Sequence, residues 1–203
     1  MDRKEKIGIV FLVLANLFQI LGQISGSLYI SIIYGYEGFG GVLNPSLQTV
    51  NQIFSTVIIS LIPVFISAIF LILGFIYTRE ANIDVDIGII GGVILLIIFV
   101  LIAIIAPLHI IVSPYTFRLG PLTISNNSRI YVELISAMFT AYAISILLVG
   151  IDYFRLGRRY KSALLKVGGI ITSLAILGPL SPIFLFLSGI INILGLIRKI
   201  LSH

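Results

Sequence analysis

Charged residues are missing from long stretches of this chain, and their absence indicates the class of protein. No charged side chain occurs between Lys6 and Glu37, or between Glu37 and Arg79. Uncharged apolar runs of about 20 residues are typical of transmembrane helices. Only 10% of the 203 residues are charged, whereas about 25% are charged in an average soluble domain. We therefore expect an all-α fold, a polytopic transmembrane helical bundle that forms one integral membrane domain over residues 1–203.

Apolar segments predict the spans, and stretches rich in glycine, proline or charge predict the loops between them. The expected spans are residues 7–33, 52–77, 87–112, 129–154 and 167–197. The last segment is interrupted by the sequence Gly-Pro-Leu-Ser-Pro at residues 178–182. It fits either one kinked span or a helical hairpin, because a straight helix of ~31 residues would far exceed a hydrocarbon core of about 30 Å. The bundle is thus expected to contain five or six membrane helices.

The distribution of basic residues predicts the orientation in the membrane. Short loops that carry lysine and arginine face the cytoplasm. Basic residues gather in the N-terminal segment 3–6 and in the connector 155–166, which predicts a multi-pass protein of the cell membrane with a cytoplasmic N-terminus. A hairpin at 167–197 would also bring Arg198 and Lys199 to the cytoplasmic side, so this rule favours the hairpin. The net charge of +5 is modest and favours contact with anionic lipid over nucleic acid.

The first expected span has one polar face. Its members recur at helical spacing and lie on a single stripe of a helix: Asn16, Gln19, Gln23 and Ser27. Gly22 and Gly26 form a G-x-x-x-G pattern beside them. The stripe either lines a polar path through the membrane or forms hydrogen bonds between closely packed helices. We favour the second interpretation, because amide side chains with small neighbours are a general packing device.

Glu133 is the intramembrane acid candidate, since it lies one turn inside the expected span 129–154. An ionisable group within a membrane suggests a role in proton or cation handling. The alternative is an ion pair with Arg129, four residues earlier and near the interface. His109 could meet Glu133 at the same face of the membrane, but one histidine and one glutamate are too few ligands for a metal site. No metal site or cofactor is therefore expected, and the chain has no cysteine.

The strongest charge cluster follows the fourth expected span. It consists of Arg155, Arg158, Arg159, Lys161 and Lys166. These residues either bind anionic lipid or a partner, or form an ordinary cytoplasmic loop, and the second reading is favoured. On the opposite side, Asn126-Asn127-Ser128 makes Asn126 a glycosylation candidate, with a chance match as the favoured alternative.

The C-terminal fifty residues resemble a known family. The pattern is a basic Tyr160-Lys161 connector, Gly168-Gly169, Pro179 within an apolar stretch, and the late Gly189. In these features the chain resembles an uncharacterised family of archaeal integral membrane proteins of the Sulfolobus type. The resemblance implies a multi-span bundle and an archaeal source. It implies no activity and no catalytic residues.

No catalytic motif accompanies these features: the sequence contains no H-E-x-x-H, G-x-S-x-G or Walker pattern. We therefore expect a non-enzymatic accessory or structural component of a membrane assembly. Its expected partners are the lipid bilayer and either another membrane protein or further copies of the chain. The alternative is a protein through which a small solute, ion or proton permeates along the polar face of the first span.

Overall fold

The computed structural model describes residues 2–43, 47–112, 128–176 and 181–202, and it describes side chains for residues 2–25, 61–104, 137–176 and 181–202. Within these residues the fold is all-α, as the apolar runs predict. The helices are α1 (Arg3–Leu43), α2 (Leu47–Glu80), α3 (Asp86–Val112), α4 (Ser128–Arg159), α5 (Ala163–Leu174) and α6 (Ser181–Leu201). Five of them are long and apolar enough to cross a membrane, and the twelve-residue α5 is not.

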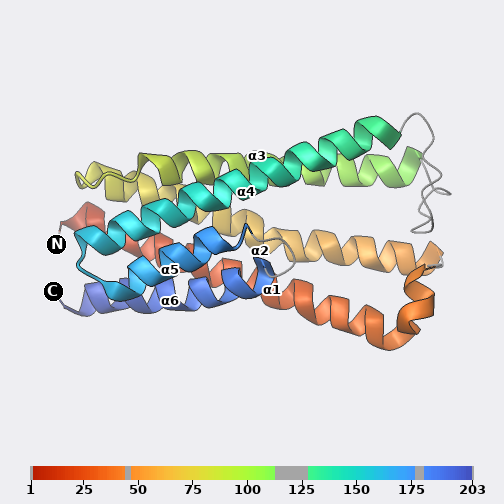
Figure 1. Cartoon of the computed structure of the whole chain (residues 1–203), viewed down its shortest axis with the longest axis horizontal. Coiled ribbons are helices and arrows are strands. Elements are labelled where there is room, and N and C mark those ends of the chain that lie inside the picture. The colour runs from red at the N-terminus through yellow and green to blue at the C-terminus, as the bar shows by residue number, and fades with distance from the viewer. Residues whose placement is uncertain (1, 44–46, 113–127, 177–180, 203) are drawn as a thin grey trace.

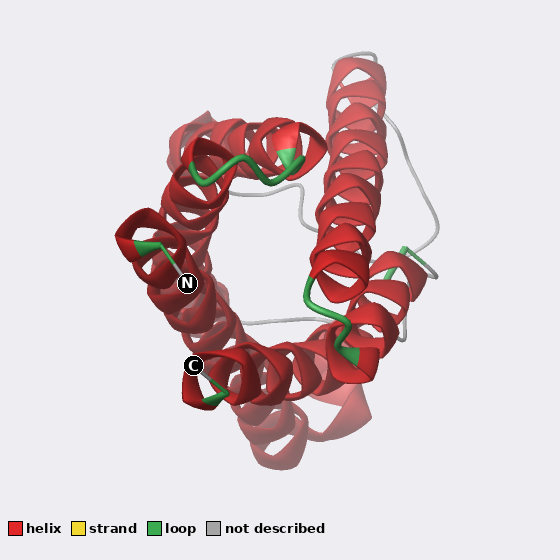
Figure 2. Cartoon of the chain, turned by 90° about the vertical axis from the view of Figure 1, so that its left-hand side faces the viewer, coloured by secondary structure: helices red, strands yellow, loops and turns green. Residues whose placement is uncertain are grey.

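The helices of the described residues form a closed ring (Figures 1 and 2). Each helix packs against its neighbours in the chain, and α6 packs against α1 to close the ring. Neighbouring helices are antiparallel. The start of α1 lies against the end of α2, where Gly8 meets Thr78, and the end of α6 lies against the start of α5, where Gly195 meets Leu165. The two ends of the chain consequently lie at the same end of the bundle (Figure 1), which we call the terminal end.

The stretch 167–197 contains parts of two separate helices, α5 and α6, which pack against each other. Gly195 lies beside Leu165 at one end of the pair, while Ala175 and Leu185 share a cluster at the other. This is the arrangement of a helical hairpin. In Figure 1 the hairpin turns back about halfway along the longer helices. Its passage through a membrane remains a prediction.

Two expected loops are shorter than the sequence suggests. The glycine-rich stretch 34–51 is helical except for the undescribed residues 44–46, because α1 continues to Leu43 and α2 begins at Leu47. Each glycine costs a helix about 1 kcal/mol, but tertiary packing commonly outweighs that propensity. The basic connector is also largely helical, so that the turn between α4 and α5 comprises only residues 160–162. Ser162 caps α5 there by accepting a hydrogen bond from the Leu165 amide.

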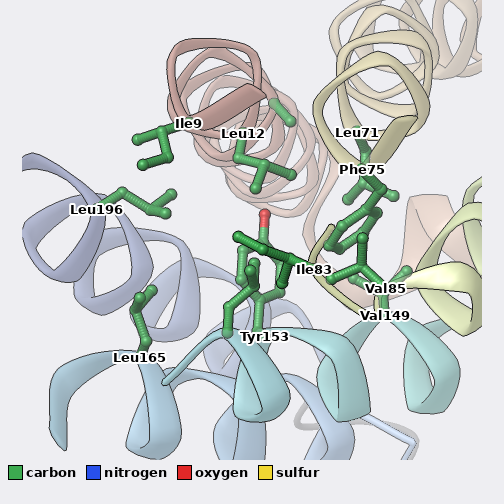
Figure 3. Packing of buried hydrophobic residues seen from close by; sticks show 12 residues of the cluster. Ile9, Leu12, Leu71, Phe75, Ile83, Val85, Val149, Tyr153, Leu165 and Leu196 are labelled. Atoms are coloured by element: carbon green, nitrogen blue, oxygen red, sulfur yellow. The ribbon is translucent and has the colours of Figure 1, made fainter. Parts of the chain in front are cut away.

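Apolar side chains fill the ring at the terminal end (Figure 3). Tyr153 of α4 lies at the centre of this core, and its ring packs against Phe75 of α2 at 5.7 Å between centroids. The other members come from α1, α2, α4, α5, α6 and the turn between α2 and α3. They include Ile9, Leu12, Leu71, Ile83, Val85, Val149, Leu165 and Leu196. The core thus joins five of the helices and the turn before α3, and Ile89 and Leu95 of α3 pack against it. The polar stripe of α1 begins next to this core.

Candidate functional site

Three buried polar side chains from three helices meet next to this core, and we call them the Asn16 layer. Asn16 of α1 donates through its amide nitrogen to the Leu12 carbonyl at 2.7 Å and to the Tyr153 hydroxyl at 2.6 Å. Asn192 of α6 donates to the Asn16 side-chain oxygen at 3.4 Å. All three side chains are at most 1% exposed, and Figure 3 shows the Tyr153 hydroxyl directed toward α1. The Asn16 layer therefore links α1, α4 and α6 across the interior of the ring.

One acceptor in this layer has no hydrogen-bond partner. The Asn192 side-chain oxygen is buried without one, and it points at Gly168 of α5, where a Cβ atom would overlap it. The absence of a side chain at Gly168 lets Asn192 reach Asn16 while α5 and α6 remain in contact. A buried unpaired acceptor in a low-dielectric interior is costly. Its presence indicates that close helix packing takes precedence there over complete hydrogen bonding.

The polar stripe continues from the Asn16 layer into a small cavity. Gln19 donates to the Leu185 carbonyl of α6 at 3.0 Å. Gln19 and Gln23 line a cavity of about 40 Å³, together with Ser67 and Thr172 among mostly apolar neighbours. A cavity of this size has room for about three water molecules. Asn16 and Gln19 thus act as interhelical contacts, whereas Gln23 faces the cavity.

Several predicted residues lie outside the part of the chain whose side chains are described. Ser27 belongs to α1, and Glu133 lies near the start of α4, but only their backbone positions are described. For His109 in α3, too, the backbone is described and the side chain is not. The glycosylation candidate Asn126 lies outside the described residues altogether. The predicted roles of these residues remain predictions.

Asp152 is a buried acid that the sequence interpretation misses. It lies within the expected span 129–154, yet its position three residues before Arg155 resembles that of an ordinary surface ion pair. In the structure its side chain is fully buried and accepts a hydrogen bond from the Gly88 amide at the start of α3. A guanidinium nitrogen of Arg155 lies 3.3 Å from a carboxylate oxygen of Asp152 and 3.4 Å from a carboxylate oxygen of Asp84. Asp152 therefore joins α3 to α4 at the terminal end.

The predicted basic cluster divides between different environments. Arg155 is bound to the two aspartates, and Lys166 is half-buried in the first turn of α5. Arg158, Arg159 and Lys161 are exposed. Among the described residues, no three histidine, aspartate or glutamate side chains are grouped closely enough to hold a metal ion. At the terminal end, the described donors around the buried Asp152 carboxylate are the Gly88 amide and the Arg155 guanidinium.

We expect Asn16→Leu to destabilise the protein by about 2 kcal/mol, because the Asn192 amide then lacks its acceptor and the Tyr153 hydroxyl loses a donor. Thermal unfolding of the purified protein in detergent measures the loss. The variant Asn16→Leu with Asn192→Leu should cost less than the two single changes added together, because both partners of one hydrogen bond are then apolar. Additive losses would contradict a coupled layer.

Comparison with known proteins assigns a family. Residues 3–203 match the model of a family described as a protein of unknown function, DUF973. Because this match covers nearly the whole chain, the chain belongs to that family. No curated protein and no solved structure matches the chain. The expected membership of an uncharacterised family is thus confirmed, and the match covers far more of the chain than the C-terminal fifty residues.

Proposed function

We propose that this member of the DUF973 family is a non-enzymatic component of a membrane assembly that serves an accessory or structural role. It lies in the cell membrane as a multi-pass protein with a cytoplasmic N-terminus. It contacts the lipid bilayer and either another membrane protein or further copies of the chain, and it does not bind nucleic acid. The archaeal source that the C-terminal resemblance implies belongs to the same proposal.

The observation that carries the proposal is that two members of the polar stripe of α1, Asn16 and Gln19, are used for packing between helices. Asn16 has hydrogen bonds to its own helix, to α4 and to α6, and Gln19 bonds to the backbone of α6. Side chains that line a transport path must exchange partners with water or solute, whereas these hold three helices together. These hydrogen bonds therefore support the interpretation of the stripe as a contact surface between helices of a stable bundle.

The positions of the basic residues support the proposed orientation. Lys4, Arg79 and Arg155 form ion pairs at the terminal end of the ring. Arg158 and Arg159 follow in the last turn of α4, and Arg198 and Lys199 in the last turn of α6. Gathering of lysine and arginine on one side favours a cytoplasmic location for that side. Both ends of the chain would then be cytoplasmic.

One observation favours permeation of a small solute, ion or proton as a second candidate. The cavity beside Gln19 and Gln23 lies inside the ring and carries polar groups from Ser67 and Thr172. Water in such a cavity would provide part of a polar path. The Asn16 layer and the Tyr153 core fill the interior next to it, so permeation would require these side chains to move.

Flux measurements on reconstituted vesicles test both candidates. With a pH-sensitive dye and a potassium gradient, we expect the parent protein to give no proton or potassium flux above that of empty vesicles. The variant with Gln19→Leu and Gln23→Leu should behave in the same way. Its control is the variant with Leu17→Ala and Leu21→Ala, which changes exposed side chains of the same helix. A flux that the glutamine variant abolishes and the control retains, with both proteins folded, would overturn the structural proposal.

A further inference from the structure

We propose that the terminal end of the protein contains a binding site for the phosphate headgroup of an anionic phospholipid. The site is a surface hollow of about 620 Å³ between the turn that joins α2 to α3 and the last turn of α4. We call it the arginine hollow. Its lining residues are Asn82, Ile83, Asp84, Arg155, Arg158 and Arg159.

The backbone holds the two walls of the hollow in place. On one side, Asn82 adopts a left-handed conformation with φ of 62°, which asparagine tolerates better than most residues. The Ile83 and Val85 side chains of the same turn are buried in the core, so the turn is anchored. On the other side, Arg155 is fixed by Asp152 and Asp84. The hollow is therefore a formed feature of the fold.

The charges lining the hollow favour an anion. Three guanidinium groups line it, and Asp84 is its one acidic lining residue. Arg155 is occupied by Asp84 and Asp152, whereas Arg158 and Arg159 have no acidic partner among the described side chains. Arginine presents a planar fork of donors that matches phosphate oxygens. Together with the side-chain amide of Asn82, the two free arginines supply donors that no described side chain satisfies.

The depth of the hollow favours a lipid over a dissolved phosphate. The apolar segment Ala137–Arg159 of α4 ends at the two free arginines, and the apolar segment of α3 begins at Asp86, two residues after Asp84. Residues at the ends of spans lie at the level of lipid headgroups. A phosphodiester headgroup at this level would enter the hollow while its acyl chains remain beside the helices.

Basic residues near a membrane also attract anionic lipid without forming a site. Lys161 separates these two explanations. It lies in the next turn, is exposed and carries the same charge as each free arginine, but it does not line the hollow. Diffuse attraction predicts that loss of charge at Lys161 matters as much as loss at Arg158 or Arg159. A defined site predicts that only the two arginines matter.

Native mass spectrometry of the purified full chain tests the proposal, with phosphatidylglycerol and phosphatidylcholine of identical acyl chains as probes. We expect the parent to retain phosphatidylglycerol preferentially. Arg158→Gln with Arg159→Gln should weaken that retention by about tenfold, as expected for the loss of charge-assisted hydrogen bonds to phosphate. Lys161→Gln should change it by less than about twofold. Asp84→Asn should strengthen it, because the hollow then loses its one acidic lining residue, whose charge repels the phosphate.

Other outcomes would overturn the proposal. Equal retention by the parent and the double arginine variant would exclude the hollow as a lipid site. An equally large loss in Lys161→Gln would assign the effect to diffuse charge. Displacement of the lipid by inorganic phosphate or glycerol 3-phosphate at the lipid's own concentration would show that the hollow recognises dissolved phosphate instead. As a control, the unfolding temperature of each variant is compared with that of the parent. A variant that unfolds at the parent's temperature is folded, so a change in its lipid retention reports on the arginine hollow.

Discussion

Replacing Gly169 with leucine is expected to lower the unfolding temperature by about 10 °C. A Cβ atom at Gly169 would come within 2.5 Å of the Phe154 nitrogen and 2.6 Å of the Gly150 carbonyl oxygen. Both atoms belong to the backbone of α4 and cannot rotate away, so α4 and α5 would have to separate. Overpacking of this kind costs about 3 kcal/mol, and each kcal/mol corresponds to about 2–4 °C in a protein of this size.

Two variants make this expectation specific to the helix seam. Gly169→Ala should give a smaller loss in the same direction, because the clash already begins at Cβ. Ala163→Leu adds similar bulk to the same helix at an exposed position and should leave the unfolding temperature unchanged. Thermal unfolding in detergent, followed by circular dichroism, measures all three. An unfolding temperature of Gly169→Leu equal to that of the parent would show that α4 and α5 are not packed as described.

Close approach through glycine recurs at every seam of the ring. The glycines involved are Gly8 and Gly74 between α1 and α2, Gly92 between α2 and α3, Gly91 between α3 and α4, Gly150, Gly157 and Gly169 between α4 and α5, Gly168 and Gly195 between α5 and α6, and Gly189 between α6 and α1. Apolar side chains cannot drive membrane helices together, because lipid is equally apolar. Small residues that allow close contact are therefore the physical reason why these helices can form a compact ring.

The sequence predicts the helices well because the hydrocarbon core demands long uncharged segments, and such segments are visible without any partner. Helix ends are less predictable. The stretch 34–51 contains glycine and proline at a density typical of loops, yet most of it is helical. Sequence patterns report local propensity, whereas the pairing of α1 with α2 along their length is a tertiary effect. The packing of α6 against α1, which closes the ring, is likewise a tertiary contact that local sequence patterns do not report.

The candidate site was predictable in part. The spacing of Asn16 and Gln19 places both on one face of a helix, and both indeed form interhelical hydrogen bonds. Their partners could not be read from the sequence, because Tyr153 and Asn192 lie more than one hundred residues away from Asn16. For Asp152, the sequence fails to indicate that the side chain is buried at all. An aspartate beside a basic connector looks solvated, and only the position of α3 reveals that it is buried.

Replacing Asp152 with alanine is expected to destabilise the protein by about 3 kcal/mol. The change removes the acceptor of the Gly88 amide, leaves a cavity beside it and takes one of two carboxylates from Arg155. Breaking a fully buried pair costs about 3–5 kcal/mol. The lower end applies here, because Arg155 is 35% exposed and keeps Asp84 as a partner. Equilibrium thermal unfolding in detergent provides the measurement.

Related variants separate the contributions of Asp152. Asp152→Asn keeps an oxygen for the Gly88 amide and should cost only about 1 kcal/mol, the scale of one net hydrogen bond. Asp84→Asn breaks an exposed pair with the same arginine and should cost less than about 0.5 kcal/mol. The double variant Asp152→Ala with Arg155→Gln should cost less than the sum of its parts, because neither charge is then left alone. If Asp84→Asn proved as damaging as Asp152→Ala, the stabilisation would come from the surface pair, and the buried link between α3 and α4 would not be what holds this end of the ring.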